Sequence, residues 1–407
     1  MAAETEEQLL VDHLARRRKS APFNGLGVRS SVFAGLLLIG AVSPATLSAQ
    51  QQTTGSFQDL FARKAASSEP QEPVAIETRT TAESRAGVRR LRIGDFQYLS
   101  DSERDYAGYD LGAGSWDTFA AVLGSAVADE FVTQAAIAKI PLNSVEVVFT
   151  SRPDTPEVAK THKVSYPRNL AYVAYIDSPA SDAQLDTLRK AVDQASSVLR
   201  IIREPVPLAH GAVNLTASPA NRDPNLPPGL RDFLVEKRTA ILRRRQRAAD
   251  AVKSGASQPP SAGLRAHTRV DPTTGIRLTK TGNHVILHDG WRRPGEPALA
   301  PSVEQHIIGV LGTCLTHIFE VQAAQKQIVL DGVELRTRAT LIPRSANGPA
   351  RFRDISYSVD IASPEPAARI TELREAVEGS CPIYNLLKDA QGIESRVARG
   401  PYNDKSS

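Results

Sequence analysis

The sequence predicts an α+β protein that contains two copies of a β-β-α-β-β-α unit. The first observation is a pair of strand hairpins. Val88–Asp101 alternates apolar and polar residues around a Gly-Asp turn at 94–95, and Ile276–Asp289 does the same around Gly-Asn at 282–283. The second observation is a long apolar helical pattern after each hairpin, at Val122–Ala136 and at Gly309–Gln327.

The third observation is a constant spacing between the two copies. A shift of 188 positions places Gly94 on Gly282 and Asp101 on Asp289. The same shift superposes seven residues of the two helical patterns, and the matching residues of the first helix are Val122, Leu123, Gly124, Phe131, Gln134, Ala135 and Ala136. An ungapped match over about fifty residues indicates an internal duplication.

Each helical pattern is followed by two strands and a second helix. The expected strands are Ser144–Ser151, Asn169–Asp177, Gly332–Ile342 and Arg353–Ile361. The second helices match at a shift of 185, which places Leu188 and Arg189 on Leu373 and Arg374. We therefore expect a first repeat over residues 88–206 and a second repeat over residues 264–397, each ending in a strand or short helix.

Segments outside the repeats have their own compositions. Residues 1–49 contain a basic cluster at 16–19 and the short apolar run Val32–Val42, the pattern of a secretory signal. The uncharged run 30–49 is also just long enough to cross a membrane. We expect export to a periplasm or anchoring through residues 30–49. A cytoplasmic location is the alternative, because the leader is partly acidic. Residues 50–87 are expected to be a flexible tether with one short helix near Phe57–Lys64, and residues 398–407 a polar tail.

A basic helix is expected between the repeats, within a connecting region at residues 207–263. Leu230–Lys253 follows a proline-rich loop and carries four clustered arginines at positions 243, 244, 245 and 247. This charge favours either an anionic surface or a solvated connector. The residues expected to dock a connector are Leu230, Phe233, Leu234, Ile241 and Leu242. Because no aromatic residues alternate with the arginines, we expect no nucleic-acid partner.

Composition limits the chemistry. The net charge is only +4, and the chain has two cysteines, Cys314 and Cys381. Two cysteines form neither a disulfide scaffold nor, without histidines at ligand spacing, a zinc site. There is no phosphate-binding glycine motif. We therefore expect neither a metal nor a nucleotide cofactor, and the two thiols are either a redox pair, a structural bridge or packing residues.

The second repeat resembles the OsmC/Ohr family of osmotically inducible and organic-hydroperoxide-resistance thiol peroxidases. The resemblance rests on the helix GVLGTCLTHIFEVQAA around Cys314 and on the Cys-Pro segment GSCPIYNLL around Cys381. The first repeat resembles the family more weakly. Because members of this family work as intertwined dimers, the resemblance implies an intramolecular pseudo-dimer. Antiparallel sheets would then surround two long central helices.

The resemblance also implies an active site. Cys314 and Cys381 correspond to the two reacting cysteines, and Glu304 corresponds to a glutamate ten residues before the first. The family's arginine lies in the preceding loop, which makes Arg292 and Arg293 candidates. A thiol attacks a peroxide as thiolate, and a nearby arginine lowers the pKa of the thiol and can bind the peroxide oxygens. The resulting sulfenic acid condenses with a second thiol to a disulfide.

The first repeat lacks these groups. Ala126 stands in place of the first cysteine, Ser196 in place of the second and Trp116 in place of the glutamate. We therefore expect one active site and one degenerate site in each chain.

The spacing of Glu304 and Cys314 raises a geometric question. Ten helical residues at about 1.5 Å each separate them by about 15 Å along a straight helix. Glu304 could then lie at the degenerate site, with Arg104 of the first repeat reaching Cys314 across the repeat interface. Alternatively, two chains associate as a homodimer and supply Glu304 in trans.

The resemblance implies a thiol-dependent peroxidase that reduces organic hydroperoxides in oxidative-stress defence. The reductant would be an external dithiol, for which the family suggests a lipoylated protein. The competing hypothesis is a non-catalytic OsmC-like stress or envelope binding protein with structural cysteines.

Overall fold

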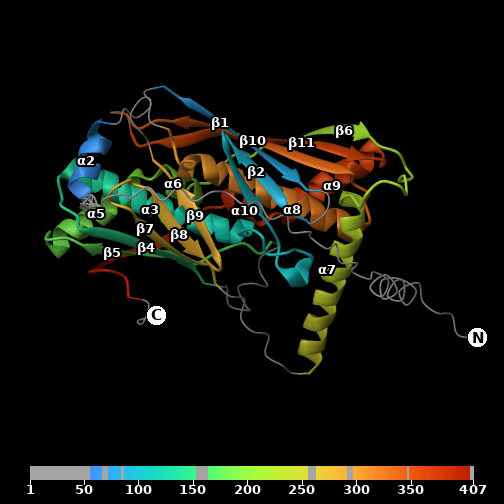
Figure 1. Ribbon diagram of the computed structural model, residues 1–407, viewed down its shortest axis with the longest axis horizontal. Coiled ribbons are helices and arrows are strands. Elements are labelled where there is room, and N and C mark those ends of the chain that lie inside the picture. The colour runs from blue at the N-terminus through green and yellow to red at the C-terminus, as the bar shows by residue number, and fades with distance from the viewer. Residues whose placement is uncertain are drawn as a thin grey trace, which may run out of the picture. The chain divides into compact units, whose positions relative to one another are not determined.

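Two six-stranded sheets and the helices packed on them contain the predicted elements (Figure 1). The computed structural model describes residues 56–66, 72–83, 87–152, 164–254, 263–290, 297–345 and 348–403. The predicted signal or anchor at 1–49 lies outside the described residues, so export and anchoring stay predictions.

Sheet A and sheet B have equivalent strand orders. Sheet A runs β3 (Phe96–Ser100), β2 (Arg89–Ile93), β1 (Val74–Ala82), β10 (Gly332–Ile342), β11 (Arg351–Ser363), β6 (Ala212–Ala217). Sheet B runs β9 (His284–His288), β8 (Arg277–Thr281), β7 (Arg265–Val270), β4 (Ser144–Ser151), β5 (Leu170–Asp177), β12 (Ile393–Arg399). In each sheet the last strand is parallel to its neighbour and the other pairs are antiparallel.

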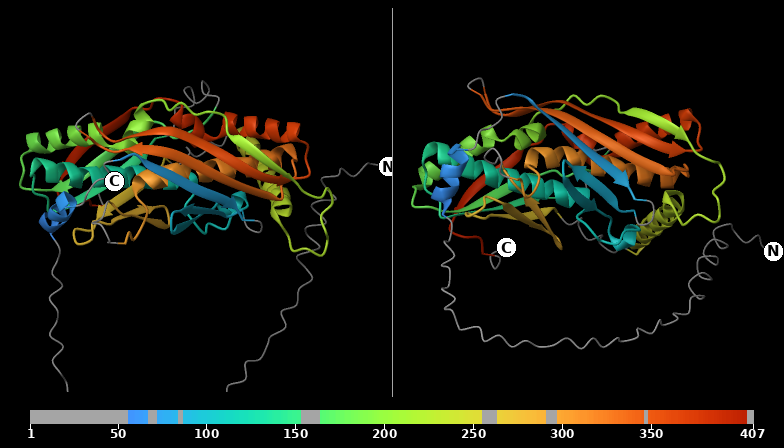
Figure 2. Two further views of the ribbon diagram at one scale, coloured as in Figure 1. Left: turned by 90° about the horizontal axis from the view of Figure 1, so that it is seen from above. Right: turned by 45° about the horizontal axis from the view of Figure 1, so that its top comes forward.

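Each sheet combines strands from both halves of the chain. In sheet A, β1 pairs with β10, and the side-chain oxygens of Thr78 and Thr337 lie 2.6 Å apart across this pair although 259 positions separate them. In sheet B, β4 pairs with β7, with Val148 opposite His267. Figure 2 shows β1 (blue) beside the orange strands of the second half. The two halves are therefore interleaved, and neither sheet is formed by one half alone.

Two long helices form the apolar centre. The first, α3 (Ser115–Ala138), packs on sheet B, the second, α8 (Val303–Lys326), packs on sheet A, and the two contact each other (Figure 1). In each helix a glycine permits the close approach of the helix to its sheet. A Cβ atom at Gly124 would lie 2.9 Å from Oγ1 of Thr268, and one at Gly312 would lie 2.8 Å from Oγ1 of Thr80. Both helices are long and apolar enough to cross a membrane, but they are mostly buried, as core helices are.

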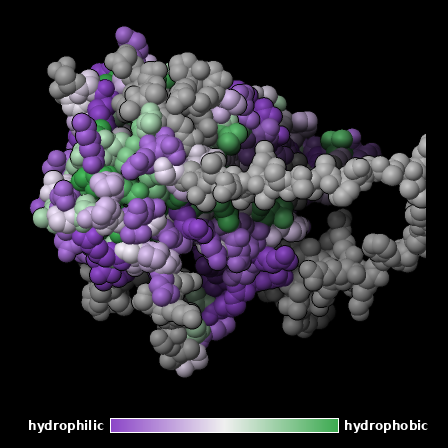
Figure 3. All heavy atoms as spheres, turned by 60° about the vertical axis from the view of Figure 1, so that its left-hand side comes forward, coloured by the Kyte–Doolittle hydropathy of each residue, from purple (hydrophilic) through white to green (hydrophobic). Residues whose placement is uncertain are grey.

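The remaining helices cover the edges of this centre. They are α2 (Phe57–Ala66), η1 (Arg104–Tyr106), α5 (Asp182–Ala195), α6 (Ser197–Arg203), α7 (Leu230–Lys253), α9 (Ala367–Ser380) and α10 (Pro382–Leu387). Among them, α5 and α6 pack against α3, while α7, α9 and α10 pack against α8. The face drawn in Figure 3 is mainly hydrophilic, with hydrophobic residues in small groups.

Most expected elements are present, and three expectations are wrong. The segment 50–87 contains the predicted short helix (α2), but it is not simply a tether, because β1 lies there and is central to sheet A. The proline-rich loop contains the edge strand β6. The basic helix has the predicted bounds and buries four of the five expected docking residues, but Leu242 is 45% exposed.

Candidate functional site

The two cysteines of the chain lie against each other in the interior. Cys314 is in the middle of α8 and is 2% exposed, and Cys381 is fully buried. Their Sγ atoms are 3.4 Å apart. A disulfide bond is about 2.05 Å long, so these are two free thiols in contact. An oxidant that removes two electrons and two protons would join them with only a small approach of the sulfur atoms.

The junction between α9 and α10 fixes Cys381. Its N–H donates to the carbonyl of Val377 and ends α9, while its own carbonyl accepts from the N–H of Asn385 and begins α10. Pro382 occupies the first position of α10, where its missing N–H costs no helical hydrogen bond. The thiol therefore lies at the N-terminus of a short helix, directed at α8.

Burial dominates the electrostatics of this thiol. It raises the pKa of Cys381 well above its usual value, and the contact with Cys314 acts in the same direction. The N–H groups of Tyr384 and Ile383 favour the thiolate but do not reverse the shift. Among the described residues, no arginine is a main cause of this pKa shift. Cys381 is therefore a protonated thiol at neutral pH.

Glu304 lies at the beginning of α8, far from its own cysteine. Its carboxylate accepts a hydrogen bond of 3.2 Å from Oγ of Ser197, the first residue of α6 in the first half. Burial, together with the nearby Asp129, raises the pKa of Glu304. The neighbouring Ser196 occupies the position in the first half that Cys381 occupies in the second. The structure thus places Glu304 beside the cysteine-free position.

The candidate arginines are not brought to the cysteine pair. Arg104 lies in η1 with an exposed side chain, and within the described part of the chain it forms no hydrogen bond or ion pair with either cysteine. Arg292 and Arg293 lie outside the described residues, in the segment 291–296. Their proposed role therefore stays a prediction.

A buried charged cluster, defined here as Arg89, Lys237, His317 and Glu320, lies on another face of α8. Nη1 of Arg89 is 3.0 Å from the carboxylate of Glu320, which is fully buried. Nδ1 of His317 is 3.7 Å from the same carboxylate. Burial lowers the pKa of His317 well below its usual value. Although His317 follows Cys314 by three residues, its polar partners are Glu320 of this cluster and Ser102, whose Oγ is 3.4 Å from Nδ1 of His317.

Lys237 joins the cluster from the connecting helix α7. It is fully buried, and its Nζ donates to Oγ of Ser102 at 3.1 Å and to the carbonyl of Tyr106 at 2.8 Å. Burial lowers the pKa of Lys237 to about 7. Sequence reasoning missed this residue, although a signal was present. Lys237 follows Phe233 by four positions and precedes Ile241 by four, so it falls on the docking face.

Two of the four clustered arginines of α7, Arg244 and Arg247, have acidic partners within the chain. Arg247 pairs with Asp105 of η1 at 3.0 Å, and Arg244 lies 3.6 Å from Glu103 and 3.7 Å from Asp105. These pairs fit the connector interpretation of the helix. Among the described residues, no group of three or more His, Cys, Asp or Glu side chains has the arrangement of a metal site.

Comparison with known proteins gives a family for the second half. The sequence model described as "OsmC-like protein" matches residues 295–396, which include Glu304 and both cysteines. Residues 295–396 are therefore similar in sequence to OsmC-like proteins. A solved structure, that of an OsmC-like protein from Mycoplasma pneumoniae, covers 31% of this chain and 89% of its own at 20% identity, with a TM-score of 0.26. A score this low adds nothing to the assignment. No curated protein sequence gives a significant match.

Proposed function

We propose that this protein is a thiol-dependent peroxidase that reduces organic hydroperoxides, with Cys314 as the attacking thiol and Cys381 as the resolving thiol. The observation that supports it is the contact of the two free thiols, 3.4 Å apart, inside an OsmC-like domain. At the level of the family, a peroxidase or stress-related role is the expectation. The assignment of these residues and of this substrate class belongs to the proposal.

The proposed reaction uses both sulfur atoms. The thiolate of Cys314 attacks the O–O bond of the hydroperoxide, and the alkoxide leaves and takes up a proton to give the alcohol. The sulfenic acid on Cys314 then reacts with the thiol of Cys381, releasing water and forming a disulfide. An external dithiol, such as a lipoyl group on a protein, reduces this disulfide by exchange and returns both thiols.

The environment of Cys381 supports this division of roles. A thiol whose pKa is raised is a poor nucleophile toward peroxide at neutral pH. It is, however, in contact with the sulfur that would become a sulfenic acid. In the proposal, Arg292 or Arg293 supplies the cation that stabilises the thiolate of Cys314.

We further propose that the two halves are duplicated repeats that form a pseudo-dimer with a single active site. The equivalent strand orders and the paired close-packing glycines of α3 and α8 support this proposal. Glu304 would then orient groups at the cysteine-free site, while Trp116 stands at the position of the first half that corresponds to Glu304. A homodimer that supplies Glu304 in trans is the alternative.

One observation favours the competing, non-catalytic function. Both cysteines are almost fully buried, which is common for thiols that only pack. In that case the domain would bind a partner or ligand in the stress response, and the thiols would not turn over. Export or anchoring through residues 30–49 is part of either proposal, with a cytoplasmic location as the alternative. A lipoylated protein as reductant would require the cytoplasmic location, because such reductants are cytoplasmic.

A titration of thiols distinguishes the two functions. The reduced protein is mixed with one equivalent of cumene hydroperoxide, and free thiols are counted within seconds. The peroxidase predicts loss of both thiols in the wild type and a trappable sulfenic acid in Cys381→Ser. It also predicts no reaction in Cys314→Ser. Two unchanged thiols in the wild type, or a bridge that resists dithiothreitol, would reject the proposal.

A further inference from the structure

A second candidate site lies where the two hairpins meet. The β2–β3 and β8–β9 hairpins come together above α3 and α8, and the hydroxyl of Tyr98 donates to the carbonyl of Leu287 at 3.3 Å, linking them (Figure 1). A pocket of about 270 Å³ opens there. Its lining includes Tyr98, Leu99, Ser100, Leu111, Val285 and His306. The two cysteines are not among these lining residues.

Two buried polar side chains of this pocket have unused hydrogen-bonding atoms. His306 is 1% exposed and Ser100 is 4% exposed. Among the described residues, neither Nε2 of His306 nor Oγ of Ser100 has a partner. The other lining hydroxyls differ, because Thr118 donates to the carbonyl of Gly114 and Thr313 donates to that of Val310. Buried polar atoms in proteins are nearly always paired, so two unpaired atoms on side chains that line one pocket point to a ligand.

The ring of His306 is held in place by its neighbours. Its Nδ1 lies 2.9 Å from Nε2 of His288, and its ring packs on Tyr98 with 4.8 Å between ring centroids. Because His288 occupies Nδ1, Nε2 is the nitrogen left for the pocket. Burial lowers the pKa of His306 to about 3, so the ring is neutral at physiological pH. Depending on the tautomer, Nε2 is then a donor or an acceptor.

The rest of the pocket is apolar or uncharged. Leu99, Leu111 and Val285 are 48%, 59% and 62% exposed and lie among the lining residues, so an apolar entrance leads to the polar atoms. The other histidine of the lining, His284, pairs with Asp110 at 3.1 Å. Among the described residues, no lining side chain is a lysine, arginine or carboxylate. A charged ligand would therefore lose its hydration without an ionic partner.

We propose that this pocket binds a small uncharged molecule that carries one hydroxyl group on an apolar body. A hydroxyl both donates and accepts, so it pairs with Ser100 and with His306 in either tautomer. The apolar body fills the space between the leucines, Val285 and Tyr98. The volume lies just below the usual range of about 300 to 1,000 Å³ for ligand pockets, which limits the ligand to one ring or a short chain.

The proposal is independent of thiol chemistry and is tested with benzyl alcohol, toluene and benzoate. Binding is measured by saturation-transfer NMR on the full chain with its thiols reduced. We expect benzyl alcohol to bind about 25-fold more tightly than toluene, about fivefold for each of its two hydrogen bonds, and benzoate to bind more weakly than either. Equal affinity for benzyl alcohol and toluene, or no binding of benzyl alcohol, would overturn it.

Variants at the rim and inside the pocket locate the binding. Val285→Trp blocks the entrance from an exposed position and is expected to weaken benzyl alcohol at least tenfold. Leu226→Trp changes a similarly exposed apolar residue, 58% exposed and outside the pocket, and should have no effect. Ser100→Ala should weaken benzyl alcohol about fivefold and leave toluene unchanged. Unaltered binding in Val285→Trp would refute the pocket as the site. The proposal would also be refuted if two chains associated through this rim, because a second chain would then cover the pocket. Such a dimer would be detected by sedimentation and abolished by Val285→Asp.

Discussion

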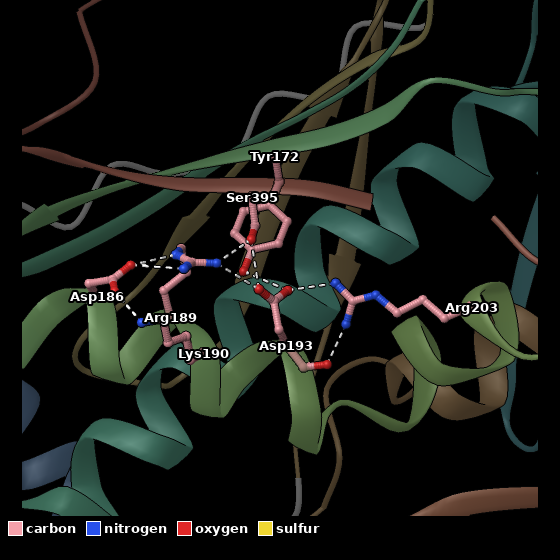
Figure 4. Close-up of polar contacts among 7 residues, drawn as sticks. All are labelled: Tyr172, Asp186, Arg189, Lys190, Asp193, Arg203 and Ser395. Atoms are coloured by element: carbon pink, nitrogen blue, oxygen red, sulfur yellow. Dashed lines mark hydrogen bonds and ion pairs between the residues drawn. The ribbon is translucent and has the colours of Figure 1, made fainter. Parts of the chain in front are cut away.

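The outer helices α5 and α9 of the two halves hold nearly the same carboxylate-centred network. The two halves differ three residues after the carboxylate, where the first has Ser196 and the second has Cys381. In the first half, Asp193 of α5 accepts from the hydroxyl of Tyr172 at 3.1 Å and from Arg189 at 3.0 Å (Figure 4). In the second half, Glu378 of α9 accepts from Tyr357 at 2.7 Å and lies 3.5 Å from Arg374. Each of these second-half residues follows its first-half counterpart by 185 positions.

Both networks also attach the outermost strand of a sheet. Ser395 of β12 donates to Asp193 at 2.6 Å, and the N–H of Gly211, directly before β6, donates to Glu378 at 2.9 Å. Arg203 of α6 adds a bond of 2.7 Å to Asp193, as Figure 4 shows. The frame is thus retained in the half that has no thiols. This teaches that the network serves the fold, whereas any thiol chemistry depends on the few positions where the halves differ.

The largest expected effect is on the rate of peroxide reduction, which should depend on the second half alone. Cys314→Ser removes the proposed nucleophile and should lower the rate of hydroperoxide consumption at least about a thousandfold, as loss of a nucleophile does in other enzymes. Ala126→Ser places the same residue at the corresponding position of the first half, where no thiol is lost, and should leave the rate unchanged. The rate is followed by loss of cumene hydroperoxide in the presence of dihydrolipoamide. Comparable rates in the wild type and in Cys314→Ser would remove the proposed difference between the halves.

Breaking the two networks should affect stability in both halves. Glu378→Ala leaves the buried hydroxyl of Tyr357 and the N–H of Gly211 without an acceptor, so we expect the free energy of unfolding to fall by about 3 kcal/mol. Asp193→Ala should cost about 2 kcal/mol, because three of its four partners, Arg189, Arg203 and Ser395, are partly exposed and reach water. The measurement is urea unfolding, with the exposed Glu372→Ala on α9 as control.

The thiol half should respond in a second way. Cys381 follows Glu378 by three residues, so Glu378→Ala should also slow formation of the Cys314–Cys381 disulfide. Asp193→Ala should not. Variants as stable as the Glu372→Ala control would show that these networks do not hold the fold.

The connecting helix α7 makes the stability of the protein depend on pH through Lys237. Because the pKa of Lys237 is lowered from its usual value to about 7, the unfolded chain binds this proton more tightly than the folded one between about pH 7 and pH 10. Stability therefore rises with pH across this window. From pH 7 to pH 9 we expect the wild type to gain about 2 kcal/mol more than Lys237→Met, measured by urea unfolding at both values. Identical gains in the two proteins would contradict a buried neutral lysine.

Much of this architecture could be predicted from sequence because the hairpins and central helices repeat at a fixed spacing. Strand β1 could not be predicted in the same way. Its buried side chains include Thr78 and Thr80, and threonine weakens the apolar alternation that marks a strand. In the folded protein these threonines lie against α8 and the neighbouring strand, a partnership that depends on residues about 250 positions away.

The residues of the site also divide into those that the sequence could place and those that it could not. Helical rise was sufficient to predict that Glu304 lies far from Cys314, because that argument is local. The contact of Cys314 with Cys381 depends on how α9 and α10 dock on α8, and only the family resemblance suggested it. Lys237 was overlooked because a lysine in an arginine-rich helix is normally taken to be solvated, and only the docked position of α7 determines which cation is buried.

The smallest expected effect compares the first turns of the two central helices. Ser302 accepts from the N–H of Gln305 and completes a capping box at α8, whereas Gly114 precedes α3 with no side-chain bond. Ser302→Ala should therefore lower the free energy of unfolding by about 1 kcal/mol. Gly114→Ser should raise it by a few tenths of a kcal/mol, since a Cβ atom there would be 3.5 Å from the nearest side-chain atom, of Asp117, an ordinary contact. If thermal unfolding showed Gly114→Ser to be the less stable protein, the bare N-terminus of α3 would be a packing requirement, and the central helices would differ in more than their thiol.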